Sequence, residues 1–185
     1  MGTESGGTTI DIELLDDVAR SQAHREDVLD RLRAVTAAPG QGRFVSSAAQ
    51  IVALAEADPA RYLLVVSCGD DVVGLGVLHP GGAPAEVVTL LQGPSSDDVV
   101  LFRGFLVDRA YQGQGVGTAV AAALPALAAR HAERLDRPAY ESVVLTVDEE
   151  NAAGLRAYAR GGFVDRGRYL GGDEGPQRAM ALAAR

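Results

Sequence analysis

Hydrophobic and polar positions along this chain alternate between two periods, which predicts a mixed α/β domain. Short apolar or alternating runs, many of them bounded by glycine, proline or aspartate, are typical of strands. Gly69-Asp70-Asp71 joins two of these runs as a predicted hairpin. Strands are predicted over residues 9–15, 62–68, 72–78, 85–91, 99–107, 141–147, 164–170 and 177–182.

Four longer segments carry helical signals. Asp16 or Asp17 is expected to cap a helix that runs to about Ala37, and Ser46 or Ser47 a second helix that runs to Ala57. A third helix should follow a glycine-rich turn and end near Leu135, with a kink at Pro125. A fourth should follow Asn151. No internal repeat divides the chain, so we expect one domain over residues 10–185 behind a flexible leader, residues 1–9.

The glycine-rich turn is the most informative segment. The apolar run that ends at Val107 enters a turn with glycines at 113, 115 and 117, and an alanine-rich helix follows. Without Cβ atoms over the turn, backbone N–H groups can converge on an anion. The first turn of the helix adds unpaired donors and its positive dipole end. The segment therefore predicts a cradle for a pyrophosphate group.

Two common nucleotide folds do not fit this turn. A Walker P-loop needs a lysine after its last glycine, and the chain contains no lysine. A dinucleotide fold would place a third glycine where Thr118 stands, and an acidic residue at a strand end about 20 positions on. Asp136 has roughly that offset but lies in a polar stretch. In contrast, the run Gln112-Gly113-Gln114-Gly115-Val116-Gly117 resembles the acyl-CoA cradle of the GNAT superfamily of N-acetyltransferases.

A second segment carries the same resemblance. Asn151, Tyr158 and Gly162-Phe163 are similar to the second cofactor segment of that superfamily. Asn151 and Tyr158 are seven residues apart and thus share one helix face. Gly154 lies between them on that face, where the family commonly has alanine. It either weakens the helix or lets the pantetheine arm of the cofactor approach.

The resemblance implies a fold, a cofactor and a reaction. The fold would be α/β, a mixed central sheet of about seven strands that splays at the cofactor strand, flanked by about four helices. Acetyl-CoA would be the donor and a primary amine the acceptor, attacking the thioester directly. Tyr158 would be the general acid, and Asn151 would bind the cofactor arm. The other cofactor-binding positions would be Phe105, Leu106, Val107, Gln112, Gly113, Gln114, Gly115, Val116, Gly117 and Thr118.

The general base and the acceptor are open at this stage. Glu86 is the candidate base, and the alternatives are Asp97, Asp98, Glu141, Asp148 and His79. Arg103, just before the cradle, either lines the acceptor pocket or pairs with an acid. The stretch from Val99 to Gly113 resembles the bacterial polyamine acetyltransferases, which favours a small cationic amine such as a polyamine. Aminoglycoside-type amines, protein N-termini and a non-catalytic acyl-CoA-binding regulatory module are the alternatives.

Composition narrows the setting. The 185 residues carry 25 acidic side chains against 17 arginines, and the net charge of −8 disfavours nucleic acid and suits a cationic substrate. No apolar run approaches the 18 residues that a membrane span needs, so no membrane partner is expected. One cysteine forms no internal disulfide, which favours the cytoplasm. No His/Cys cluster has metal-ligand spacing. A homodimer is compatible with the chain.

Overall fold

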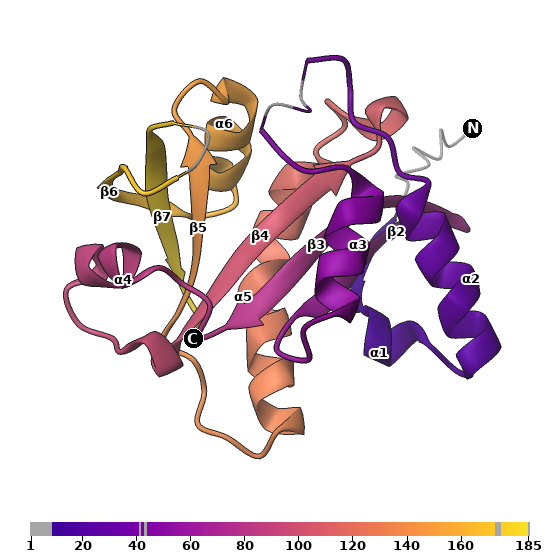
Figure 1. Cartoon of the computed structure of the whole chain (residues 1–185), viewed down its shortest axis with the longest axis horizontal. Helices are drawn as coiled ribbons and strands as arrows, with labels where there is room; N and C mark the ends of the chain where they lie inside the picture. Colours follow the sequence, from indigo (N-terminus) through magenta and orange to yellow (C-terminus); the bar gives the residue numbers. More distant parts are fainter. Residues whose placement is uncertain (1–8, 41, 43, 173–174, 185) are drawn as a thin grey trace, which may run out of the picture.

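Seven strands form one mixed sheet in a computed structural model that describes residues 9–40, 42, 44–172 and 175–184 (Figure 1). The strand order is β1-β2-β3-β4-β5-β7-β6. β4 and β5 are parallel, and every other neighbouring pair is antiparallel. The strands are β1 (Ile10–Leu14), β2 (Tyr62–Cys68), β3 (Asp71–Pro80), β4 (Val99–Val107), β5 (Ser142–Asp148), β6 (Val164–Tyr169) and β7 (Gln177–Ala183). The predicted mixed seven-stranded sheet is thus confirmed.

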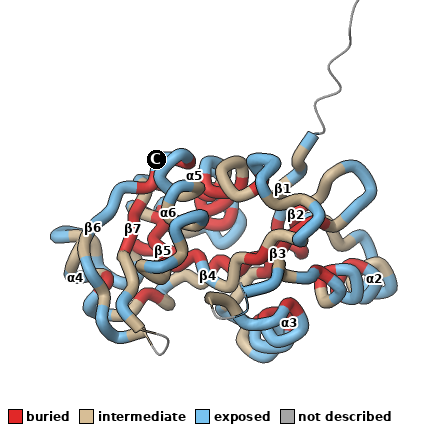
Figure 2. The backbone as a smooth tube through the Cα atoms, turned by 90° about the horizontal axis from the view of Figure 1, so that it is seen from above, coloured by how far each residue is buried: buried red, intermediate tan, exposed pale blue. Residues whose placement is uncertain are grey.

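Helices cover both faces of the sheet (Figure 2). They are α1 (Leu15–Val18), α2 (Gln22–Arg33), α3 (Ala48–Glu56), α4 (Ala85–Leu91), α5 (Val116–Arg134) and α6 (Ala152–Arg160), with short 3-10 helices η2 (Ser96–Asp98) and η3 (Arg109–Tyr111). The apolar stripes of α2, α3 and α4 pack on one face of the sheet, and those of α5 and α6 pack on the other. The result is a three-layer α/β domain.

Residues 85–91 form helix α4, so the strand predicted there was wrong. Val87 is fully buried, and Val88 and Leu91 pack beside it at helical spacing. The Thr89 hydroxyl also bonds back to the Ala85 carbonyl at 2.8 Å. A seven-residue apolar run fits a buried strand and one face of a short helix equally well, and packing decides between them.

The single helix predicted from Asp16 or Asp17 to Ala37 is two helices. α1 ends at Val18, and Ser21 caps α2 by accepting a hydrogen bond from the His24 N–H at 3.2 Å. This break and α4 raise the described count to six helices, against the four expected. The predicted cap at Ser47 is confirmed as a capping box with Gln50. Pro125 lies inside α5, and the kink expected there stays a prediction.

The sheet opens between β4 and β5, as predicted. The two strands pair only from Val99 to Leu101, against Ser142 to Val144. Beyond these residues β4 and β5 diverge, and the backbone of β4 from Phe102 onward has no strand partner on that side. The opening lies at the end of the sheet where the glycine-rich turn and α6 begin, so it positions the candidate site.

Two further expectations concern the chain as a whole. The predicted leader, residues 1–9, lies outside the described residues except for Thr9. Within the part of the chain that the structure describes, none of the helices has the length and apolarity to cross a membrane.

Candidate active site

A cavity of about 380 Å³ occupies the opening between β4 and β5. Four segments supply most of its wall: the second half of β4, the glycine-rich turn with the start of α5, the end of β5, and α6. Its lining residues are Phe44, Val45, Phe102–Val107, Tyr111, Gln112, Gly113, Gly115–Thr118, Thr146–Asp148, Asn151, Ala153, Gly154, Arg156–Tyr158, Arg160 and Gln177. Tyr158, Asn151 and every predicted cofactor position except Gln114 are therefore brought together. Gln114 instead donates its side-chain amide to the Ala110 carbonyl at 2.8 Å.

The glycine-rich turn has the geometry of an anion cradle. Gly113 and Gly115 adopt φ of 75° and 88°, a region that favours glycine, and a Cβ added at either would meet no atom within 4 Å. Within the described residues, the N–H groups of these two glycines make no hydrogen bond. The first N–H groups of α5, which begins at Val116, have no intrahelical acceptor. The turn therefore presents unpaired donors and open space, which fits a diphosphate.

Two side chains hold this turn on the end of β4. Gln112 donates its side-chain amide to the Val107 carbonyl at 2.9 Å. Asp108 accepts hydrogen bonds from the N–H of Ala110 at 2.9 Å and of Thr36 at 3.0 Å. These N–H bonds, with Ala110 the larger effect, lower the pKa of the Asp108 carboxyl below its usual value. Sequence reasoning missed Asp108 as an anchor because Thr36 lies 72 residues away.

A bulge in β4 reshapes the strand at the mouth of the opening. Leu75 pairs with Leu106 and Val77 with Arg103, so Gly76 of β3 faces two residues of β4, Gly104 and Phe105. Gly104 has φ of 60°, and a Cβ there would lie 3.2 Å from Ile51 Cγ2. Glycine is thus required at this point by both its backbone angle and its closeness to α3.

Tyr158 contacts the cavity from α6. Its side chain is half-buried, and its ring meets Phe163 edge-on at a centroid distance of 5.9 Å. The hydroxyl has no hydrogen-bond partner among the described residues, and burial raises the pKa of Tyr158 well above its usual value. The hydroxyl therefore stays protonated near neutral pH, as a proton donor must.

Asn151 both caps α6 and lines the cavity. It is the N-cap of α6, and its Oδ1 accepts a hydrogen bond from the Gly154 N–H at 2.9 Å. Its Nδ2 makes no hydrogen bond to another described residue, so a donor remains for a ligand. A Cβ at Gly154 would lie 2.8 Å from that Nδ2. The glycine at position 154 is thus explained locally, because it leaves room for the Asn151 side chain.

The carboxylates considered as bases lie in different places. Glu86 is exposed in the first turn of α4 and does not line the cavity. Asp97 and Asp98 lie in η2, before β4, and Glu141 is exposed just before β5, far along the strands from the opening. Asp148, at the end of β5, is the only carboxylate among the described lining residues.

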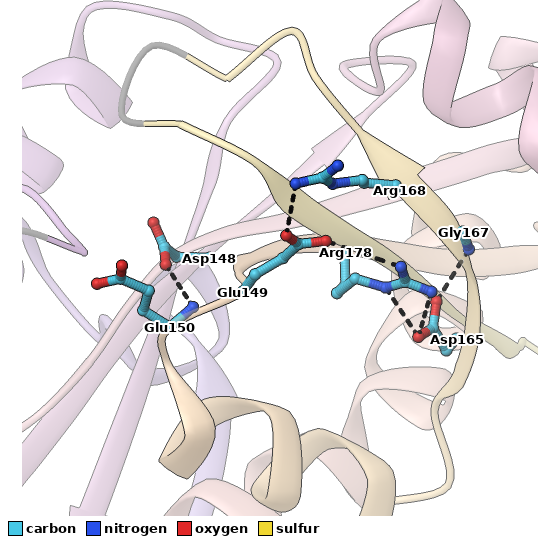
Figure 3. Close-up of polar contacts among 7 residues, drawn as sticks. All are labelled: Asp148, Glu149, Glu150, Asp165, Gly167, Arg168 and Arg178. Carbon is cyan, nitrogen blue, oxygen red and sulfur yellow. Dashed lines mark hydrogen bonds and ion pairs between the residues drawn. The ribbon is translucent and has the colours of Figure 1, made fainter.

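Asp148 stands apart from the ion pairs beside it (Figure 3). Its neighbour Glu149 pairs with Arg168 at 3.1 Å and with Arg178 at 3.7 Å, and Arg178 also pairs with Asp165 at 2.8 Å. Asp148 accepts only the Glu150 N–H, at 2.7 Å, and makes no ion pair within the described residues. Its charge is therefore available to the cavity.

Several lining residues had no assigned role in the sequence. Arg156 and Arg160 are four residues apart on α6 and so share a face with each other, but not the face of Asn151 and Tyr158. Phe44 and Val45 come from the connection before α3, and Gln177 from the start of β7. No local pattern marks these last three, because only the tertiary fold brings them to β4.

Fold and cavity together define a class: an α/β protein whose central sheet splays beside a backbone anion cradle and a half-buried tyrosine. The model of the acetyltransferase (GNAT) family matches residues 30–163, most of the chain. The chain belongs to this family and is an acyltransferase that uses acetyl-CoA, as the sequence indicated. No curated protein sequence matches the chain significantly.

Solved structures with the same fold differ widely in sequence. Aminoglycoside acetyltransferase AAC(6')-Ib in complex with coenzyme A is 15% identical over 95% of each chain, with a TM-score of 0.64. A GNAT-family acetyltransferase from Streptococcus pneumoniae is 14% identical over 95% of this chain and 99% of that one, with a TM-score of 0.56. The ribosomal-protein-S18-alanine N-acetyltransferase from Escherichia coli is 16% identical over 95% and 94%, with a TM-score of 0.56. At these identities, the likeness speaks for the fold alone.

Proposed function

We propose that this protein transfers an acetyl group from acetyl-CoA to a small primary amine in the opening between β4 and β5. Tyr158 acts as the general acid and Asp148 as the general base. The observation that carries the proposal is that a protonated tyrosine, an unpaired carboxylate and an anion cradle line one cavity. Acetyl-CoA supplies the activated thioester.

Different residues along the cavity bind different parts of acetyl-CoA. The N–H groups of Gly113, Gly115 and the first turn of α5 hold the diphosphate. The unpaired backbone of β4 from Phe105 to Val107 offers main-chain groups to the pantetheine arm, in the manner of an added strand. The Asn151 side chain donates to the same arm. Each group is fixed by the fold before any ligand binds.

Proton transfer falls to two side chains. An alkyl ammonium has a pKa near 10, so it must lose a proton before it attacks. Asp148 accepts this proton directly or through a water molecule, a role that the sequence gave provisionally to Glu86. Tyr158 holds a proton on its hydroxyl oxygen and donates it to the departing sulfur.

The acceptor is a primary amine, and this part of the proposal draws support from relatives. AAC(6')-Ib has been solved with kanamycin, and another relative is named for acetylating the alanine of a ribosomal protein. The acidic residues Glu86, Asp97 and Asp98, which could attract a polyamine, do not line the cavity. The polyamine hypothesis therefore rests on the likeness of the β4 strand end and on the net charge of the chain.

The test is release of free thiol from acetyl-CoA across a panel of primary amines, with two variants. Tyr158→Phe should lower kcat by at least tenfold, within the range of about 10²–10⁴ usual for general acids, with little change in acetyl-CoA affinity. Asp148→Asn should lower kcat at neutral pH, and its activity should recover as the pH approaches the pKa of the amine. Tyr169→Phe and Asp27→Asn, outside the cavity, are the matched controls.

Each outcome decides one part of the proposal. Normal kcat in Tyr158→Phe would show that the hydroxyl is structural, and a normal pH profile in Asp148→Asn would remove the base. Tight acetyl-CoA binding without thiol release for any amine would favour the regulatory module.

A further inference from the structure

Arg103 is a cation in the cavity wall that the reaction does not use. We propose that Arg103 binds a carboxylate of the acceptor, so that the substrate is a small amine that also carries a carboxylate, as a free amino acid does. This inference rests on the proposed function and specifies its substrate class.

The position of Arg103 assigns it to the acceptor rather than to the cofactor. It directly precedes the bulge at Gly104 and pairs with Val77 of β3. Side chains alternate along a strand. Leu101, two positions earlier, belongs to the cluster under α4, whereas Phe102 belongs to the cluster under α5. Arg103 therefore lies on the face of the sheet opposite α5, away from the cradle at the start of that helix.

Arg103 has no counter-ion in the part of the chain that the structure describes. Its side chain is exposed to the solvent of the cavity, yet enough protein surrounds it that burial lowers its pKa. The one charged neighbour that shifts this pKa is Arg61, a second cation, which already pairs with Asp58 at 3.0 Å. Asp148 does not compensate Arg103, although both line the cavity.

His79, the other titratable group beside Arg103, does not supply negative charge either. Burial, followed by Arg61, lowers the pKa of His79, so that its ring is neutral near neutral pH. Arg103 is thus partly desolvated, and the nearby carboxylate of Asp58 is already paired with Arg61. A guanidinium held in this way gains most from an anion that its planar fork can bind with two hydrogen bonds.

This arrangement selects among amines. A carboxylate on Arg103 would fix one end of a small acceptor while its amine reaches the splayed end of β4. A polyamine would instead bring a second ammonium group toward Arg103, where like charges repel. The cavity therefore favours an amino acid over the amine that results from its decarboxylation.

The experiment compares matched pairs that differ only in the carboxylate: lysine against 1,5-diaminopentane, and phenylalanine against 2-phenylethylamine. With the intact protein, kcat/KM should be roughly tenfold to hundredfold higher for the carboxylate-bearing member, the usual value of a charge-assisted hydrogen bond. Arg103→Gln should bring this ratio close to one, mainly through KM, and Arg103→Lys should keep part of it. Arg166→Gln, an exposed arginine on β6 outside the cavity, is the control with the same change of charge.

The outcomes separate this inference from the proposed function. If amines are acetylated but the decarboxylated members are equal or better substrates, the inference is overturned and the acetyltransferase stands. An equal loss of kcat/KM for both members of a pair in Arg103→Gln would also overturn it, since Arg103 would then act by positioning β4 and would not bind a carboxylate. Should no amine be acetylated, the proposed function fails first. If Arg103→Gln does not fold, the pairs with the intact protein and with Arg103→Lys still decide.

Discussion

Gly161, the C-cap of α6, packs directly against α5, and α6 is the helix that carries Asn151 and Tyr158. Its φ is −75°, so alanine would cause no backbone strain. A Cβ there would nevertheless lie 2.3 Å from Ala121 Cβ and 3.1 Å from the Ala122 backbone nitrogen. Carbon atoms pack at about 3.5–4.0 Å, so Gly161→Ala must push α6 away from α5 by an ångström or more.

The expected cost is that of overpacking a rigid core. Insertions of this kind destabilise by about 1–3 kcal/mol. For a chain of this length each kcal/mol lowers Tm by roughly 2–4 °C, which gives a fall of roughly 2–12 °C. Because α6 moves with Tyr158, kcat should fall as well, while the cradle at Gly113 and Gly115 still binds acetyl-CoA.

Urea and thermal unfolding of a double-mutant cycle test the contact itself. Ala121→Gly removes the methyl group at 2.3 Å and alone costs about 1 kcal/mol, as glycine does inside a helix. Combined with Gly161→Ala, it should restore stability relative to the sum of the single changes, with a coupling within the usual range of about 0.5–3 kcal/mol. Gly93→Ala is the matched control, since a Cβ there would meet nothing within 4 Å.

Two results would refute this reasoning. One is an unfolding free energy of Gly161→Ala equal to that of the unaltered protein. The other is a strictly additive cycle, which would place the damage of Gly161→Ala somewhere other than Ala121.

Two further predictions concern the cradle and pH. Gly117→Glu should abolish acetyl-CoA binding by calorimetry in a folded protein. Its Cβ would make an ordinary contact with Ala157 at 3.4 Å, so the fold tolerates it, whereas its carboxylate would repel the diphosphate; unchanged affinity would remove this cofactor site. His131 is 1% exposed. Burial, followed by the charges of Arg134 and Arg137, lowers the pKa of His131 below the ordinary 6.5. The contribution of the neutral ring to stability is therefore complete above pH 6.5 and is lost as the pH falls through the folded-state pKa. His131→Gln should therefore flatten the fall in unfolding free energy below pH 6.5, and an unaltered slope would assign that fall to other groups, among them His79.

The cofactor half of the site could be predicted from sequence because its geometry is local. Glycines at 113 and 115 dictate the turn, and a spacing of seven puts Asn151 and Tyr158 on one helix face. Each relation spans less than three helical turns of chain. Tertiary packing has little freedom to alter such relations, so Gly113, Gly115, Asn151 and Tyr158 all line the cavity.

The acceptor half could not be predicted in the same way. Its wall joins Phe44, Arg103 and Gln177, which are far apart in the chain and meet only in the folded sheet. Glu86 was attractive as a base while residues 85–91 were expected to be a strand of the sheet. As the first turn of α4 they place its carboxylate at the surface, and Asp148 takes its place at the cavity.

Net charge does not describe the charge of the cavity wall. The chain carries −8 in total, which suggested a cationic substrate. Among the residues that the structure describes, the charged ones that line the cavity are Arg103, Arg156, Arg160 and Asp148, so the local sign among them is the reverse of the global one. Many of the acidic side chains are at the surface, where water and salt screen them beyond roughly 8 Å at physiological ionic strength. A substrate inside the cavity therefore responds to these few side chains, and together with the cradle they suit an anionic group on each of the two ligands: the phosphates of the donor at the cradle and, in our proposal, a carboxylate of the acceptor at Arg103.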